Sequence, residues 1–195
     1  MSRWCKALAG GLLLTMVVQL FAFSAVCEDI RGDVLRVHIL ANSDSEEDQT
    51  LKLKVRDAVL AVGEGVLDGV VSRDEAKARL QQALPTLQAA AQQCVYDNGF
   101  TDTVTAQTVN MYFTTRTYES GTYPAGYYDA VRFTIGEGKG KNWWCVLYPP
   151  MCLSAAMDTS SLSPSENAVI QNGQRYLVRF KVVEWLQECM SFFKR

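Results

Sequence analysis

Residues 34–62 read VLRVHILANSDSEEDQTLKLKVRDAVLAV, and this stretch decides the fold class. Residues 34–41 form an almost continuous apolar run of strand-forming types, which predicts a strand in the middle of a sheet. The Asn-Ser-Asp-Ser segment that follows ends the strand and begins a helix, because Asp44 or Ser45 can cap it and acidic side chains fill its first turn. We expect this helix to run to about Val62.

The predicted helix carries apolar side chains on two sides. One stripe has helical spacing and predicts the buried face; its members are Leu51, Val55, Ala58, Val59 and Val62. Leu53 and Leu60 project from nearly the opposite side, beside Arg56 and Asp57. Two interpretations follow: the helix is packed between two layers, or Leu53 and Leu60 belong to a surface that binds a partner.

Helical and strand patterns alternate along the rest of the chain. A second helix begins at the capping pattern Ser-Arg-Asp-Glu of residues 72–75. Strand patterns cover residues 103–113, 127–135 and 143–148, and the last two should pair as an antiparallel hairpin across a Gly-rich turn. Residues 153–174 are Ser-rich and predict a long loop, whereas residues 175–193 predict a terminal helix with a wide apolar arc.

These patterns predict an α+β fold. We expect a single domain with a mainly antiparallel sheet, packed with about three helices, after an N-terminal signal or anchor segment. The chain has 195 residues, of which 48% are apolar and 21% charged, and this composition is typical of a globular protein with a real core. The net charge is −2 with no basic stripe, so nucleic acid is not expected as a partner.

The first segment has the pattern of an export signal. Arg3 and Lys6 form a positive start, residues 7–26 are uncharged, and small residues around Ser24 offer a cleavage site. Twenty apolar residues can also span a bilayer. We therefore divide the chain into residues 1–27, a signal peptide or membrane anchor, and residues 28–195, an exported domain.

Export makes disulfide bonds available to the six cysteines of the chain. Cys145 and Cys152 are the best candidates for a pair, because Pro149 and Pro150 lie between them and can turn the chain back. The alternative is that both are buried thiols. The four cysteines after residue 27 could form disulfide bonds in three different pairings, and the sequence does not choose among them.

Few residues suggest catalysis. His38 is the only histidine, so a His-rich metal site is excluded, and no cofactor is expected. A pair of His38 and Cys145 would suit an exported thiol or cell-wall hydrolase, but a lone histidine in an apolar strand more often has a structural role. Ser43 beside His38 is better explained by the start of the helix than by a nucleophile.

Adjacent tryptophans stand out in the last predicted strand. Trp143 and Trp144 must point to opposite faces of a sheet. One can fill the core, while the other is covered by a further layer or remains partly exposed, and tryptophan is enriched where proteins bind one another. This pair therefore suggests an interaction surface.

Several blocks of the sequence resemble the stage II sporulation protein R family. The resemblance covers roughly residues 31 to 190, and the blocks that carry it are RVHILANSDS at 36–45, LKLKVRDAV at 51–59, PAG at 124–126, IGEG at 135–138, NWWCV at 142–146 with Pro149, Pro150 and Cys152, and KVVEW at 181–185. Family members often have a proline near Thr114, which is absent here, and this departure concerns the local turn rather than the resemblance.

The resemblance implies a signalling role without catalytic residues. Members of the family are made in the forespore and secreted into the space between the two septal membranes. There they activate a membrane-embedded aspartic protease of the mother cell, which then cleaves a sigma factor precursor. For this chain we expect the partner-binding residues to be His38, Asn42, Asp44, Arg56, Asp57, Arg132, Asn142 and Trp144.

Overall fold

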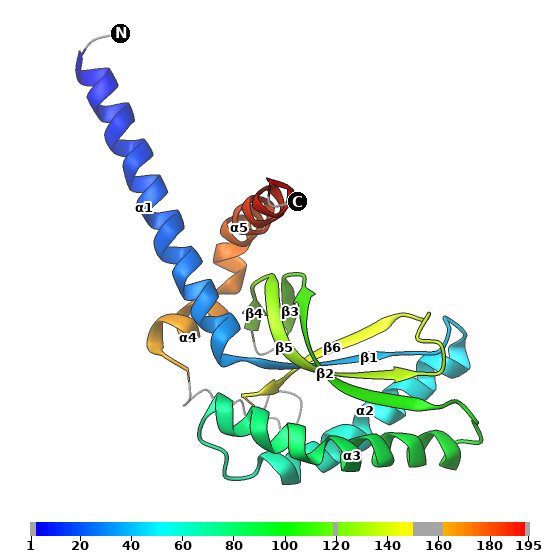
Figure 1. The fold of residues 1–195 in the computed structure, drawn as a ribbon. Helices are drawn as coiled ribbons and strands as arrows, with labels where there is room; N and C mark the ends of the chain where they lie inside the picture. Colours follow the sequence, from blue (N-terminus) through cyan, green and yellow to red (C-terminus); the bar gives the residue numbers. More distant parts are fainter. Residues whose placement is uncertain (1–2, 119–120, 150–161, 194–195) are drawn as a thin grey trace. The chain divides into compact units, whose positions relative to one another are not determined.

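The structure is a computed structural model that describes residues 3–118, 121–149 and 162–193 (Figure 1). These residues form helices and strands in separate runs, with a long apolar helix at the start, so the predicted α+β class is confirmed. The packing divides the chain into two compact units. The sheet unit comprises Asp33–Tyr112 and Tyr127–Ser161, and the helical unit comprises Met1–Gly32, Phe113–Gly126 and Leu162–Arg195.

A four-stranded sheet with two long helices on one face makes up the sheet unit (Figure 1). Its elements are β1 (Leu35–Leu40), α2 (Glu46–Leu67), α3 (Arg73–Asp97), β2 (Val104–Phe113), β5 (Gly126–Ile135) and β6 (Asn142–Tyr148). The strand order is β2-β5-β1-β6. Strand β1 runs parallel to β5 and antiparallel to β6, so the sheet is mixed.

The predicted hairpin between β5 and β6 is wrong, because β1 lies between them. Both edges of β1 then have hydrogen-bonded neighbours, as suits a strand whose residues are almost all buried. The Gly-rich turn spans the end of β1, and the amides of Lys139 and Gly140 donate to the carbonyls of Asn42 and Ala41 at 3.1 and 2.9 Å. The turn therefore connects β5 to β6 across the end of β1.

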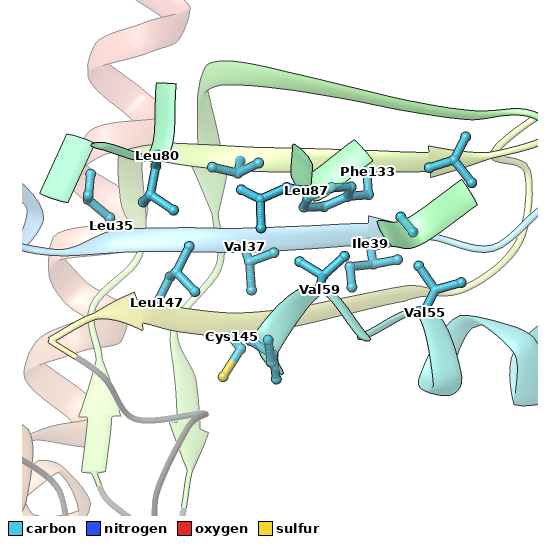
Figure 2. Packing of buried hydrophobic residues seen from close by; sticks show 14 of the residues in the cluster. Leu35, Val37, Ile39, Val55, Val59, Leu80, Leu87, Phe133, Cys145 and Leu147 are labelled. Carbon is cyan, nitrogen blue, oxygen red and sulfur yellow. The ribbon is translucent and has the colours of Figure 1, made fainter. Parts of the chain in front are cut away.

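The core of the sheet unit lies between the sheet and its two helices. Val37 and Ile39 of β1 point toward α2 and α3, where they meet side chains such as Val59 and Leu87 (Figure 2). All four are at most 2% exposed. Fully burying a side chain of this size stabilises the fold by roughly 1.5–3 kcal/mol, so this face of β1 fixes the packing of both helices.

Helix α2 begins as predicted and ends later. Ser45 is its N-cap and accepts a hydrogen bond from the amide of Asp48 at 3.1 Å. The helix continues past Val62 to Leu67, because the buried side chain of Leu67 stabilises the additional turn. Leu60 is also buried, whereas Leu53 remains 40% exposed, so only Leu53 can belong to a partner surface.

The helical unit contains a long first helix, a small two-stranded sheet and two terminal helices. Its elements are α1 (Arg3–Asp33), β3 (Arg116–Tyr118), β4 (Gly121–Tyr123), α4 (Pro164–Gln171) and α5 (Gly173–Phe193). By length and composition α1 could cross a membrane, although a signal sequence has the same properties. Strands β3 and β4 pair antiparallel.

Helix α4 corrects the prediction of a long loop over residues 153–174. Ser163 and Glu166 form a reciprocal capping box in front of it, and Pro164 occupies the first helical turn. This pattern is a known start signal for helices, but the polar composition around it obscured it. Residues 153–161 lie outside the described part of the chain.

Candidate functional site

His38 occupies the middle of the sheet, on the face opposite α2 and α3. Its direct neighbours in the register are Arg132 of β5 and Trp144 of β6. Since side chains alternate along a strand, these three residues project from the same face. The sequence predicted each of them as a partner contact, and the strand order brings them together.

The His38 ring is held on two sides. Its Nε2 lies 2.7 Å from Oδ1 of Asn142, and its ring stacks on Trp144 with centroids 4.3 Å apart. An amide oxygen only accepts hydrogen bonds, so this contact requires the proton to be on Nε2. Burial lowers the pKa of His38, with a smaller lowering effect from Arg132, while the Asn142 hydrogen bond opposes the shift. The ring is therefore neutral at pH 7.

Arg132 and Trp144 lie at the surface edge of this arrangement. Both are partly exposed, Asn142 is exposed, and His38 beneath them is buried. The Arg132 guanidinium donates from Nε to the side-chain oxygen of Gln107 at 3.1 Å, with the Gln107 amide oriented to accept. We call His38, Arg132, Asn142 and Trp144 the His38 patch. Gln107 was not predicted, because only the strand order places β2 beside β5.

Two further residues of the same face were also missed as site residues. Arg36 is fully buried, and its guanidinium lies 5.0 Å from the centre of the Tyr128 ring, which is equally buried. A buried cation over an aromatic face gains on the order of 2 kcal/mol. Arg36 of β1 and Arg132 of β5 thus lie on one face of the sheet, and only the tertiary structure distinguishes buried Arg36 from partly exposed Arg132.

Asn42 and Asp44 have a structural task at the end of β1. Oδ1 of Asn42 accepts from the amide of Glu137 at 2.9 Å, and Oδ1 of Asp44 accepts from the amide of Lys141 at 2.7 Å. Asp44 therefore anchors the Gly-rich turn, and Ser45 alone caps α2. Neither residue joins the His38 patch.

Arg56 and Asp57 belong to α2, on the other side of the sheet. The Arg56 guanidinium lies 5.2 Å from the Trp143 ring centre and pairs with Asp57 at 2.7 Å. Trp143 packs against the core, and Trp144 stacks on His38, so the two tryptophans use opposite faces as predicted. The eight predicted contacts thus separate into one patch of four and two pairs elsewhere.

The proposed pair of His38 and Cys145 does not form. Cys145 is the register partner of Val37, points into the core beside the helices, and is disulfide-bonded. His38 projects from the opposite face, where its Nε2 contacts Asn142. The expected bonding partner, Cys152, lies outside the described residues, so the Cys145–Cys152 pairing stays a prediction.

A cavity of about 160 Å³ lies elsewhere in the sheet unit, and Lys77, Gln81 and Asn110 are among its lining residues. Asp129 at its wall accepts from Lys77 at 2.6 Å and from Asn110 at 3.0 Å, and it pairs with Arg73. Partial burial alone would raise the pKa of Asp129, but the hydrogen bonds and cations lower it below its ordinary value. This carboxylate joins α3 to β5.

Comparison with known proteins finds its match in the part of the chain that contains the sheet unit. The family model described as Stage II sporulation protein R matches residues 31–158. Stage II sporulation protein R of Bacillus subtilis (strain 168) is 38% identical over 123 residues, which are 63% of this chain and 55% of that protein. The chain thus spans just over half the length of this relative. No solved structure matches. The chain belongs to the stage II sporulation protein R family.

Proposed function

We propose that this member of the stage II sporulation protein R family is an exported signal that acts by binding. In this proposal the chain crosses the forespore membrane, reaches the space between the septal membranes and activates a membrane-embedded aspartic protease. The protease then cleaves the precursor of the mother-cell sigma factor. Family membership over residues 31–158 supports the sporulation role. This range includes every strand of the sheet unit.

The observation that carries a binding role is the His38 patch. Trp144 and Arg132 are residue types that dominate binding energies at protein interfaces. Here both are partly exposed and held in place, one by the His38 ring and the other by Gln107. A side chain that is already fixed loses less entropy when a partner binds. The patch is therefore built to present a rigid aromatic ring and a cation.

Activation places a further demand on the partner surface. A ligand shifts an equilibrium only by its difference in affinity for the two states. The His38 patch must therefore contact a part of the protease that differs between its inactive and active arrangements. Each tenfold preference for the active arrangement corresponds to about 1.4 kcal/mol, an amount within the reach of one well-packed tryptophan.

Reconstitution tests this proposal directly. The full chain is placed in membranes with the protease and the sigma factor precursor, and precursor cleavage is followed with time. We expect Trp144→Ala to raise the concentration needed for half-maximal cleavage by roughly 30-fold, since a central tryptophan contributes 2 kcal/mol or more. Tyr96→Ala is the matched control, because Tyr96 is 55% exposed on α3 and should leave cleavage unchanged.

Three outcomes separate the interpretations. A folded Trp144→Ala protein that activates like the wild type removes the His38 patch from the partner surface. Absence of cleavage with the wild-type chain, in membranes where the protease is otherwise competent, contradicts the activator role itself. Turnover of cell-wall fragments by the chain alone, abolished by His38→Ala, supports a hydrolase instead.

A further inference from the structure

The first helix has two parts with different surroundings. Its N-terminal part is apolar and exposed, with Leu12, Leu13 and Leu14 each 65% exposed or more. Its C-terminal part is built into the helical unit, where Phe23, Cys27 and Ile30 are at most 5% exposed. Residues 7–26 would span about 30 Å as a helix, which matches the hydrocarbon thickness of a bilayer.

Packing around the predicted cleavage site favours an intact helix. Phe23 stacks on Tyr176 with centroids 5.5 Å apart and lies 5.1 Å from Phe180, both on α5. Further along, Nη1 of Arg31 donates to the carbonyl of Ala125 at 3.0 Å. The helix continues without a break past Ser24. Cleavage after Ser24 would remove Phe23 and uncover Phe180, a loss comparable to the roughly 3–5 kcal/mol of a Phe→Ala substitution in a core.

Helix α5 buries one apolar face within the helical unit and leaves another uncovered. Phe180 and Val183 are buried, whereas Val178 is 77% and Trp185 62% exposed. Figure 1 shows α1 and α5 starting near one another and diverging toward their outer ends. An open and mainly apolar groove of about 430 Å³ lies between the two helices. It is lined by Leu12, Met16 and Leu20 of α1 and by Val178, Arg179 and Val182 of α5.

We infer that α1 stays with the mature protein and that this groove and the outer face of α5 are filled by lipid acyl chains of the outer leaflet. The groove continues the exposed apolar surface of α1, within the part of α1 long enough to span a bilayer. Trp185 provides the amphipathic ring that is enriched at membrane interfaces. Arg179, which lies 5.4 Å from the Tyr176 ring centre, can extend its charge toward the headgroups.

One ion pair on α5 lowers the cost of charge at this position. Lys181 pairs with Glu184 at 2.7 Å, which reduces the cost of bringing either side chain near lipid. The attraction is apolar, because residues 28–195 are more acidic than the whole chain and are not drawn to anionic headgroups. Helix α5 is therefore a second membrane contact of the helical unit, and this inference does not depend on protease activation.

Quenching by brominated lipid tests the position of Trp185. The full chain is reconstituted in phosphatidylcholine vesicles with and without brominated acyl chains, and fluorescence is recorded for the wild type and for Trp185→Phe. The difference between the two proteins isolates Trp185 from the other three tryptophans. We expect brominated lipid to remove more than half of this difference signal. An undiminished difference signal overturns the inference and leaves α5 facing water or another protein.

A matched pair of variants separates lipid contact from misfolding. Val178→Asp should reduce the quenching of Trp185 at least twofold while α1 remains inserted. Val71→Asp, at a residue that is 81% exposed in the sheet unit, should leave the quenching unchanged. Equal effects of both variants contradict the inference. N-terminal sequencing of the protein from sporulating cells adds a second test, and a chain that begins after Ser24 rules the inference out.

Discussion

His38 shows how the function of a residue depends on its neighbours. The sequence identified it as a single histidine in an apolar strand, and the structure gives it a hydrogen bond to Asn142 and a stacked contact with Trp144. The ring is buried at 3% exposure and supports the exposed part of the patch from below. Its titration should therefore affect the stability of the fold.

We predict that the fold becomes less stable as the pH is lowered, because of His38. Its pKa is lowered in the folded state, so below about pH 6.5 the unfolded chain binds a proton that the folded chain does not. The free energy of unfolding should then fall by up to about 1.4 kcal/mol per pH unit, until the folded-state pKa is reached. Denaturant unfolding between pH 7 and 5 measures this slope.

His38→Phe is the control, because phenylalanine keeps a ring against Trp144 and cannot titrate. Carboxylates change their protonation mostly below this range, so the variant should show a nearly flat profile. A wild-type profile as flat as that of His38→Phe would contradict the assignment of the pH dependence to this residue.

Gly140 is a second residue whose importance is set by its surroundings. A Cβ atom added there would lie 2.1 Å from the carbonyl oxygen of Ser43, where the backbone cannot give way cheaply. We expect Gly140→Ala to destabilise the fold by roughly 2–4 kcal/mol, a large effect for a single methyl group. Gly65→Ala is the counterpart, since Gly65 has open space within α2 and alanine there should add about 0.5–1 kcal/mol. Urea unfolding compares the two, and equal effects would show that the turn tolerates a side chain.

At the scale of elements, helix faces are set by what lies opposite them. Helix α2 presents Leu51, Val55 and Val59 to the core as its spacing predicts, and Leu60, which lies outside that stripe, is buried in the same core. Helix α3 contributes Leu80 and Leu87 to the same core (Figure 2). The spacing identified the stripe of each helix, but the degree of burial at its margins came from the neighbouring helix.

We predict that two leucine truncations on these helices have very different costs. Leu87→Ala leaves a cavity between α3 and the sheet and should lower the free energy of unfolding by about 2–5 kcal/mol. Leu53→Ala, at a residue that is 40% exposed on α2, should stay within about 1 kcal/mol of the wild type. Thermal unfolding of both variants provides the comparison, and a similar loss for Leu53→Ala would show that this residue is covered in solution.

The whole molecule consists of two units that each bury their own apolar residues. The sheet unit has the core between β1, α2 and α3, and the helical unit has the contacts of Phe23 with Tyr176 and Phe180. Separate cores allow separate unfolding, because cooperative units of a protein open with their own free energies. The proposed partner surface lies in the sheet unit, and the inferred lipid contact lies in the helical unit.

We predict that Phe180→Ala weakens one unit and spares the other. The variant removes a ring that is 2% exposed and packed on Phe23, so the free energy that protects α5 and residues 23–32 of α1 against hydrogen exchange should fall by about 3–5 kcal/mol. Exchange in β1, β5 and β6 should remain as in the wild type. Loss of protection across the sheet as well would show that the two units unfold as one.

Local patterns in the sequence determined a large share of this protein. They specified β1, a start of α2 at Asp44 or Ser45, the strands β2, β5 and β6, the opposite directions of Trp143 and Trp144, and the apolar first helix. Each of these depends on residues a few positions apart. Four of the eight predicted contact residues also proved to lie together. The capping box of α4 was readable from Ser163 and Glu166 but was hidden by a polar setting.

Only the tertiary structure decided the strand order, and with it the site. Placing β1 between β5 and β6 joins segments about a hundred residues apart, and such pairing depends on which arrangement buries the most apolar surface and satisfies both edges of β1. That placement brings His38, Arg132 and Trp144 onto one face and sends Cys145 to the other. No pattern within a single segment contains this information.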